Sequence, residues 1–355
     1  MSAPSAVGQT WPGLLNRLVR GEDLTTDDTR WAMREVMTGE ATPVQVAAFA
    51  VALRAKGESA EEVAGLAAEM LARATPVALP LECVDIVGTG GDGAHTVNIS
   101  SMAAVVTAAT GVPVAKHGGR AASSSSGAAD VLEALGVVID LPAAAVARCV
   151  EEAGIGFFFA PVFHPGMRHA AVPRRELGIA TVFNFLGPLT NPARPAAAAI
   201  GVADPRMAPV VAEVLAERGT RAVVFRGDDG LDELTTATTS SAWLVREGEV
   251  VPDRVDPGAL GVPVSGVDAL RGGDPAFNAD VFRRLVDGER GPVRDAVLLN
   301  AAAALAAFDE RSVRLHDALA AGMERAAAAV DDGRAAALLE RWRTVSRALR
   351  QGAAR

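Results

Sequence analysis

The feature of this chain that most constrains its fold is an alternation, beginning at Cys83, of short β-branched runs and Ala-rich stretches with helical spacing. Parallel strands need a crossover between them, usually a helix, so this alternation predicts a parallel α/β sheet. The stretch from about Pro292 onward is mostly helical again. We therefore predict a large α/β domain over residues 80–355 with a mainly parallel central sheet. The expected strands are 84–87, 112–115, 137–139, 198–202 and 222–225, and the expected helices lie near 100–110, 128–135, 142–153 and 206–218.

The first 79 residues carry helix signals instead. Thr42 before Pro43 is an N-cap followed by proline at the first helical position, and the apolar run after it ends at Lys56-Gly57. Ser59 with Glu62 makes a capping box for a helix that runs to about Arg73. Residues 1–79 are therefore expected to form a small all-helical domain.

Composition excludes several classes of function. With 34 basic against 43 acidic residues the net charge is −9, which argues against nucleic-acid binding. The cysteines Cys83 and Cys149 are too few for a disulfide framework or a thiolate metal site, so a reducing cytoplasm is the simplest setting. No stretch approaches the roughly 18–20 apolar residues of a membrane span, and the N-terminus lacks a targeting pattern. We expect a soluble cytoplasmic protein without a membrane or nucleic-acid partner.

A glycine cluster follows the first expected strand. The run Gly88-Thr89-Gly90-Gly91-Asp92-Gly93 has four glycines in six residues, and Asn98, Ser100 and Ser101 open the next apolar helix. Glycines let backbone N–H groups approach an anion, and a helix N-terminus adds aligned dipoles. This pattern predicts a phosphate cradle, although it matches neither G-x-G-x-x-G nor the P-loop. A tight strand-to-helix turn would account for only one or two of the glycines.

A second cluster of this kind follows the next strand. Lys116-His117-Gly118-Gly119-Arg120 precedes the serine run 123–126 and a helix near Ala128, and Lys116 is one of only two lysines in the chain. Two cations and several hydroxyls at a second helix entry predict a second anion site. The alternative is a flexible Ser-Gly loop with surface charge. Two such sites at adjacent strand ends predict a ligand with two phosphoryl groups.

Three weaker signals lie further along the chain. The acidic pair Asp232-Glu233 suits magnesium, but acidic pairs on turns are usually solvated surface. His164 and His169 are five apart and no Cys or carboxylate completes a zinc set. Arg174 could bind an organic carboxylate through its planar guanidinium. Since no activated nucleophile is evident either, the residues alone indicate metal-assisted handling of a phosphorylated small molecule.

Together these motifs resemble the anthranilate phosphoribosyltransferase family over nearly the whole chain. The segments that carry the resemblance are GTGGDGAHTVNISS, KHGGRAASSSSGAADVLEALG, RRELGIATVFNFLGPLTNPA and GDDGLDELTT, in the family's order. The resemblance implies the nucleoside phosphorylase/phosphoribosyltransferase type of fold, with helices from about 165–192 joining the small domain. It also implies a homodimer through the helical part, and two magnesium ions per subunit. The reaction it implies transfers phosphoribose from phosphoribosyl pyrophosphate (PRPP) to the amino group of anthranilate, in tryptophan synthesis.

The resemblance also assigns site residues by position. Lys116 would carry leaving-group charge, no dedicated base is expected, and Ser100, Asp232 and Glu233 match the magnesium-binding positions. The positions that match the PRPP site are Gly88, Gly91, Asp92, Thr96, Asn98, Ile99, Ser100, Ser101, Lys116, His117, Gly118, Gly119, Arg120, Ser123, Ser124 and Ala128. Those that match the anthranilate site are Gly88, His117, Gly119, His164, Met167 and Arg174.

The sequence departs from the family's pattern on the acceptor side. Gly119 stands where the family usually has an asparagine that contacts the acceptor, Ala128 replaces a frequent serine, and Met167 occupies a variable position. A paralogue with a different aromatic acceptor is therefore one alternative. A second alternative is a pyrimidine nucleoside phosphorylase-like enzyme, but the GTGGD loop and the acidic pair argue against it. A third is a non-catalytic nucleic-acid-binding relative, which the acidic pair and the net charge argue against.

Overall fold

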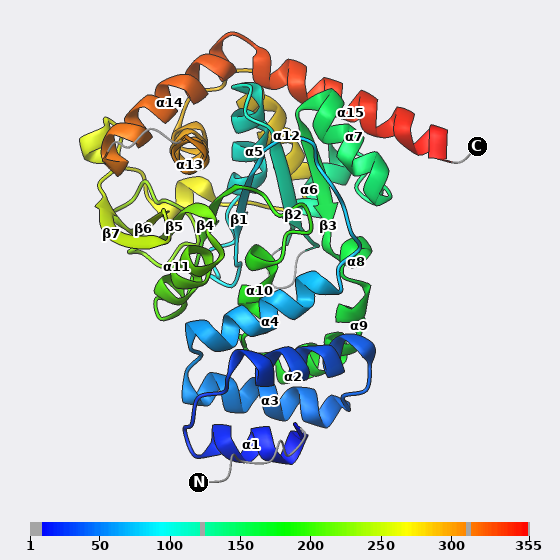
Figure 1. The fold of residues 1–355 in the computed structure, drawn as a ribbon. Coiled ribbons are helices and arrows are strands. Elements are labelled where there is room, and N and C mark those ends of the chain that lie inside the picture. Colours follow the sequence, from blue (N-terminus) through cyan, green and yellow to red (C-terminus); the bar gives the residue numbers. More distant parts are fainter. Residues whose placement is uncertain (1–8, 121–124, 310–313, 354–355) are drawn as a thin grey trace.

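The computed structural model describes residues 9–120, 125–309 and 314–353. Four short helices form the N-terminal end of the molecule, and the α/β part lies above them (Figure 1). These helices are α1 (Trp11–Val19), α2 (Thr26–Thr38), α3 (Pro43–Lys56) and α4 (Ala60–Ala72). Thr42 and Ser59 cap α3 and α4 as expected, each within a full capping box.

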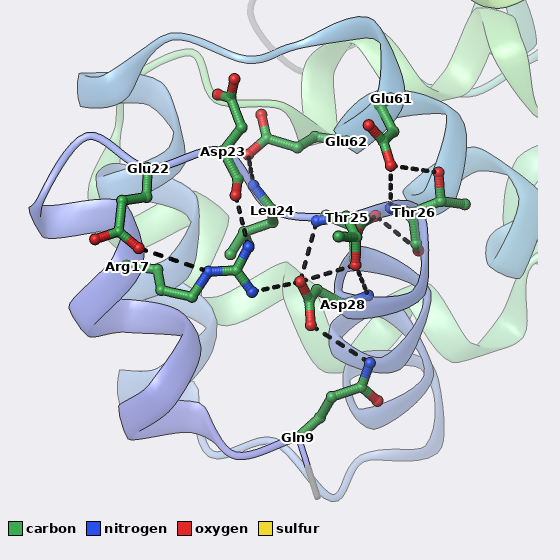
Figure 2. A network of polar contacts seen from close by, with 11 residues as sticks. Gln9, Arg17, Glu22, Asp23, Leu24, Thr25, Thr26, Asp28, Glu61 and Glu62 are labelled. Carbon is green, nitrogen blue, oxygen red and sulfur yellow. Dashed lines mark hydrogen bonds and ion pairs between the residues drawn. The ribbon is translucent and has the colours of Figure 1, made fainter. Parts of the chain in front are cut away.

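Buried polar groups tie the N-terminal helices together. Glu62 is fully buried, accepting a hydrogen bond from the backbone N–H of Leu24 at 2.9 Å and one from Lys56 Nζ at 2.9 Å. Figure 2 shows the neighbouring network, in which Arg17 of α1 reaches Asp28 of α2 at 2.6 Å. These bonds link α1 to α2, and α4 both to α3 and to the loop before α2, so they help to fix how the four helices are oriented.

Two helices from the middle of the chain pack on this bundle. Helix α9 (Arg168–Leu177) contacts α2 and α3, and α10 (Phe183–Leu189) contacts α4, α11 and β2. The apolar core of the bundle continues through these helices to α11 (Met207–Arg218) and one face of the sheet. The boundaries at 1–79, 80–355 and 165–192 stay predictions.

The sheet has seven strands in the order β3-β2-β1-β4-β5-β6-β7. The five from β3 to β5 are parallel, and β6 and β7 are added antiparallel at one edge. The strands are β1 (Val84–Gly88), β2 (Val114–Gly118), β3 (Ile155–Phe159), β4 (Ala197–Gly201), β5 (Arg221–Gly227), β6 (Ser240–Arg246) and β7 (Glu249–Val255). Since the chain leaves β1 for β2 and returns to β4 on its other side, the strand order reverses at β1, where ligands bind in such sheets.

Alternate residues of the central strands face two different cores. Ala199 and Val223 pack with α5 and α13 on one face, whereas Ile200 and Val224 pack with α11 on the other. This alternation explains why the strands read as continuous apolar runs, because both faces are covered. The remaining helices are α5 (Ile99–Ala109), α6 (Ala128–Ala134), α7 (Ala143–Ala153), α8 (Ala160–Phe163), α12 (Pro275–Val286), α13 (Pro292–Phe308), α14 (Leu315–Asp331) and α15 (Arg334–Ala353), with 3-10 turns η1 (Pro165–Met167), η2 (Gly258–Leu260) and η3 (Val267–Leu270).

The expected fold class is confirmed, and so are four of the five expected strands, with small shifts in their ends. The strand expected at 137–139 is wrong. This segment is extended but unpaired between α6 and α7, and the backbone N–H of Val138 donates to Ser346 Oγ of α15 at 3.1 Å. Val137 and Ile139 are nevertheless buried, in the same apolar core as Trp342 of α15. None of the described helices is long and apolar enough to cross a lipid bilayer.

Candidate active site

Both glycine clusters lie at the carboxyl edge of the sheet, where the parallel strands β1 and β2 end side by side. They line a cavity of about 290 Å³ together with the acidic pair that follows β5. Gly90 and Gly91 have φ of 70° and 87°, a conformation that side chains other than glycine rarely adopt. The first cluster is thus a tight turn whose backbone faces the cavity.

Most residues assigned to the PRPP and metal sites line this one cavity. The exceptions are Ser101, whose hydroxyl is buried in α5 without a hydrogen-bond partner among the described residues, and Ser123 and Ser124, which lie outside the described residues. The assigned residues at the cavity are Gly88, Gly91, Asp92, Thr96, Asn98, Ile99, Ser100, Lys116, His117, Gly118, Gly119, Arg120, Ala128, Asp232 and Glu233.

Lys116 projects from β2 beneath the first cluster and is only 1% exposed. Its Nζ donates to the carbonyl of Ile86 at 2.7 Å and lies 3.4 Å from Ser100 Oγ. Burial lowers the pKa of Lys116, while the nearby carboxylates of Asp85 and Glu233 oppose that shift. The ammonium group is therefore held at the floor of the cavity by strands β1 and β2.

The carboxylates of Asp232 and Glu233 are also buried, at 8% exposure each. Burial and the charge of Asp92 raise the pKa of Asp232 to about 7. Burial and the charge of Asp232 raise the pKa of Glu233 as well. Crowded carboxylates of this kind are stabilised by a cation, so their chemistry fits magnesium.

The acidic pair is held in place by its neighbours. The backbone N–H of Gly90 donates to Asp232 Oδ2 at 2.7 Å, which links the first glycine cluster to the loop after β5. Leu234, the next residue, is bonded through both its N–H and its carbonyl to the amide of Asn300 on α13. No group of three or more His, Cys, Asp or Glu side chains that could hold a metal is found in the described part of the chain. Magnesium does not require one, because it commonly binds one or two carboxylates plus substrate phosphate and water.

A second cavity of about 460 Å³ adjoins the first. It is lined by all six residues assigned to the anthranilate site, namely Gly88, His117, Gly119, His164, Met167 and Arg174. The two cavities share seven lining residues, which are Val87, Gly88, Thr89, His117, Gly118, Gly119 and Asn184. A donor in the first cavity and an acceptor in the second would therefore meet at the ends of β1 and β2.

Two neutral imidazoles border the second cavity. His117 Nδ1 lies 3.0 Å from the Gly187 carbonyl and His164 Nε2 lies 2.8 Å from the Thr190 carbonyl. Because a carbonyl only accepts, these nitrogens carry the protons, and His117 Nε2 and His164 Nδ1 are left as buried, unpaired acceptors. Burial lowers the pKa of His117 to about 3 and that of His164 to about 4. Both rings are therefore uncharged at neutral pH.

Arg174 supplies a cation to this second cavity. It lies in the last turn of α9, with its guanidinium 5.9 Å from the ring centre of Phe183. Burial lowers its pKa, and it forms no ion pair with any described residue. A partly buried guanidinium without a carboxylate partner among the described residues is suited to binding one from a ligand.

Some residues that line the two cavities, and one beneath them that lines neither, were not assigned from the sequence. Met70 of α4 looked like an ordinary core residue, and Asn184 lay within a quoted motif but without a role. Asp85 looked like part of a strand, yet its buried carboxylate accepts from the backbone N–H of His117 at 3.1 Å and from Asn191 Nδ2 at 2.8 Å. A polar residue inside an apolar strand was the available signal for Asp85.

The fold and the cavity at its sheet edge define a glycosyl transferase with a separate helical bundle. The family model described as glycosyl transferase family, a/b domain, matches residues 81–336. The model described as glycosyl transferase family, helical bundle domain, matches residues 12–74. Both the class of enzyme and the two-part architecture expected from the sequence are thereby confirmed.

Relatives identify the branch of this family. The chain is 65% identical over 342 residues to anthranilate phosphoribosyltransferase of Acidothermus cellulolyticus, covering 96% of each protein. The crystal structure of the Thermus thermophilus enzyme of that name has a TM-score of 0.88 at 42% identity, covering 94% of this chain and 99% of the other. The Saccharomyces cerevisiae enzyme in complex with PRPP and Mg has a TM-score of 0.86 at 27% identity, covering 95% and 98%. The chain belongs to the anthranilate phosphoribosyltransferases, enzymes of tryptophan biosynthesis.

Proposed function

We propose that this site transfers the phosphoribosyl group of PRPP to the amino group of anthranilate and releases pyrophosphate. The observation that carries the proposal is that two cavities of opposite chemistry share one wall. The first offers glycine N–H groups, Lys116 and an acidic pair for a phosphorylated donor. The second offers Arg174 and two neutral histidines for an aromatic amino acid.

The donor is held by the first cavity. The N–H groups of the Gly88–Gly93 turn and of the start of α5 bind phosphate oxygens, as a helix N-terminus does. Lys116 faces the same space and stabilises the charge that develops on pyrophosphate as it leaves. Asp232, Glu233 and the Ser100 hydroxyl would hold magnesium, in two ions per subunit. Bound magnesium would neutralise part of that same leaving-group charge.

The acceptor is held by the second cavity. Arg174 binds the carboxylate of anthranilate, and the unprotonated nitrogens of His117 and His164 suit an amine that donates hydrogen bonds. The amine nitrogen then forms a bond to the anomeric carbon while the bond from that carbon to pyrophosphate breaks, and the amine loses one proton. A neutral aromatic amine is already a nucleophile, so alignment is the main contribution and no dedicated base is needed.

We also propose that the chain forms a homodimer through its helical part. Val19 of α1 and Val44 of α3 are 80% and 77% exposed, and Val51 of α3 is 38% exposed. Val44 and Val51 are seven residues apart on α3 and so lie on the same side of that helix, and an exposed apolar patch is typical of a protein interface. Sedimentation velocity of Val44→Asp beside the parent tests this, since the variant should sediment as a monomer at concentrations where the parent is dimeric. Equal sedimentation of both would contradict it.

The decisive assay follows the loss of anthranilate fluorescence on addition of PRPP and magnesium. Saturable turnover that requires both supports the proposal. PRPP binding without turnover of anthranilate would indicate that the enzyme uses another aromatic acceptor. Phosphate-dependent cleavage of thymidine or uridine would favour a nucleoside phosphorylase. Salt-sensitive retention on DNA would support the nucleic-acid-binding alternative.

A cytoplasmic location stays a prediction, with Cys83 and Cys149 both free and buried.

A further inference from the structure

Asn278 of α12 is a buried asparagine that joins no motif recognised from the sequence. Its side chain is 2% exposed and both ends of its amide are bonded. Oδ1 accepts from the backbone N–H of Gly273 at 2.9 Å, and Nδ2 donates to Asn98 Oδ1 at 2.9 Å. Because Gly273 presents an N–H, the orientation of the Asn278 amide is fixed, with its NH₂ group toward Asn98.

Asn98 connects Asn278 to the serine run that follows the second glycine cluster. It stands at the N-cap of α5, yet its side chain makes no capping bond to that helix. Instead, Asn98 Nδ2 donates to the backbone carbonyl of Ser126 at 3.0 Å. Turning the Asn98 amide by 180° would set its NH₂ against the NH₂ of Asn278 and its oxygen against the Ser126 carbonyl. Three hydrogen bonds therefore run in one direction, from Gly273 through Asn278 and Asn98 to the Ser126 carbonyl. The Ser126 hydroxyl adds a longer bond to Asn98 Oδ1, at 3.4 Å, which the same orientation of the Asn98 amide accepts.

The segment before α12 reinforces the same contact. The backbone N–H of Gly272 donates to the His95 carbonyl at 2.8 Å, and that of Val97 donates to the Leu270 carbonyl at 2.9 Å. A Cβ at Gly272 would lie 2.6 Å from the Thr96 carbonyl oxygen, so only glycine allows this approach. The segment 95–97, which connects the first glycine cluster to α5, is thus held by the residues that lead into α12.

We propose that Asn278 is a positioning residue for the phosphorylated donor, acting through Asn98 to hold the two anion cradles in a single geometry. The proposal rests on the proposed function, which places PRPP across both cradles. Asn278 itself does not line the cavity, so its effect on PRPP must pass through Asn98. A ligand with two phosphoryl groups is sensitive to the spacing of the cradles, whereas the acceptor, which binds in the second cavity, is not.

The test uses the full chain and titration calorimetry with PRPP in magnesium chloride, without an acceptor. Asn278→Ala should weaken PRPP binding about five- to tenfold, the effect of one lost buried hydrogen bond. KM for anthranilate should change by less than about twofold. Leu285→Ala is the matched control, because Leu285 is buried on the same helix two turns away and lines neither of the two cavities. It should lower Tm without weakening PRPP binding.

A double-mutant cycle with Asn98→Ala separates positioning from general destabilisation. In the Asn98→Ala background, Asn278→Ala should weaken PRPP binding by no more than about twofold, because the path is already broken. Asn278→Asp keeps an oxygen for Gly273 but faces Asn98 Oδ1 with a second oxygen. Asn278→Asp should therefore weaken PRPP binding more at pH 8 than at pH 6, because a carboxyl that is protonated at pH 6 can donate to Asn98 Oδ1.

These experiments distinguish failure of the Asn278 proposal from failure of the proposed reaction. If the parent binds PRPP but does not convert anthranilate, the proposed acceptor fails and the Asn278 test proceeds unchanged. If the parent does not bind PRPP, both proposals fail. The positioning role would be overturned if Asn278→Ala weakened PRPP binding equally in the parent and in the Asn98→Ala variant. It would also be overturned if Leu285→Ala weakened PRPP binding as much as Asn278→Ala does.

Discussion

The backbone N–H of Gly90 donates to Asp232 Oδ2 at 2.7 Å, so the first glycine cluster and the acidic pair form one unit across 142 residues of sequence. Gly88 makes this approach possible, since a Cβ there would collide with the Asp232 carboxylate. The first glycine cluster and the acidic pair are therefore positioned by each other.

Gly88→Ala should displace the Asp232 carboxylate and lower kcat/KM by about 100-fold, the usual effect of misplacing a catalytic group by an ångström. Steady-state kinetics with PRPP and anthranilate measures this. Gly266→Ala is the matched control, because a Cβ at Gly266 meets nothing within 4 Å and Gly266 lies outside both cavities. A Gly88→Ala enzyme with parental kcat/KM would show that the close approach is not needed.

The pKa of Asp232, raised to about 7 by burial and by Asp92, predicts a pH-dependent response to magnesium. A carboxyl with a raised folded pKa stabilises the protein below its unfolded value of 3.8, and this contribution is lost as pH rises through about 7. Without magnesium the stability contributed by this group should thus fall as pH rises from about 4 to about 7. Magnesium should raise Tm more at pH 8 than at pH 6, because it binds the ionised carboxylates.

Thermal unfolding of the parent and of Asp232→Asn, with and without magnesium, measures this effect. The amide removes a buried charge, so the variant alone should melt about 2 °C higher than the parent at pH 8 and respond less to magnesium. An equal magnesium-induced shift in Tm at both pH values would show that the acidic pair does not control cation binding.

Arg174→Ala should raise KM for anthranilate about 10- to 100-fold, because one charge-assisted hydrogen-bonding partner of the carboxylate is lost. KM for PRPP should stay within about twofold, since Arg174 lines only the second cavity. Arg175→Ala is the matched control, being the adjacent arginine on α9 but exposed and outside both cavities. Equal effects of the two substitutions on KM for anthranilate would remove Arg174 from the acceptor site.

Much of this site could be predicted because its signals are local in sequence. Strand ends followed by glycines, such as 84–93, and capping boxes such as Ser59 with Glu62 are complete within a few residues. Strands β3, β6 and β7 were not expected from the sequence, and β3 is the plainest case, because Ile155–Phe159 has only one β-branched residue and so does not form a β-branched run. Asn278 and Asn300 were missed for another reason: their partners lie 180 and 66 residues away, and a lone asparagine in an apolar helix does not indicate which backbone it meets.

Gly119→Asn tests the acceptor side of the proposed function directly. A Cβ at Gly119 meets nothing within 4 Å, and Gly119 lines both cavities, so the first atom of a side chain there displaces no neighbour. The added amide offers one further hydrogen bond, which should lower KM for anthranilate by up to about tenfold. Substrate titration at saturating PRPP measures this, with Gly119→Ala as the control for bulk alone. An unchanged or higher KM in Gly119→Asn would indicate that the open space at Gly119 serves a larger aromatic acceptor than anthranilate.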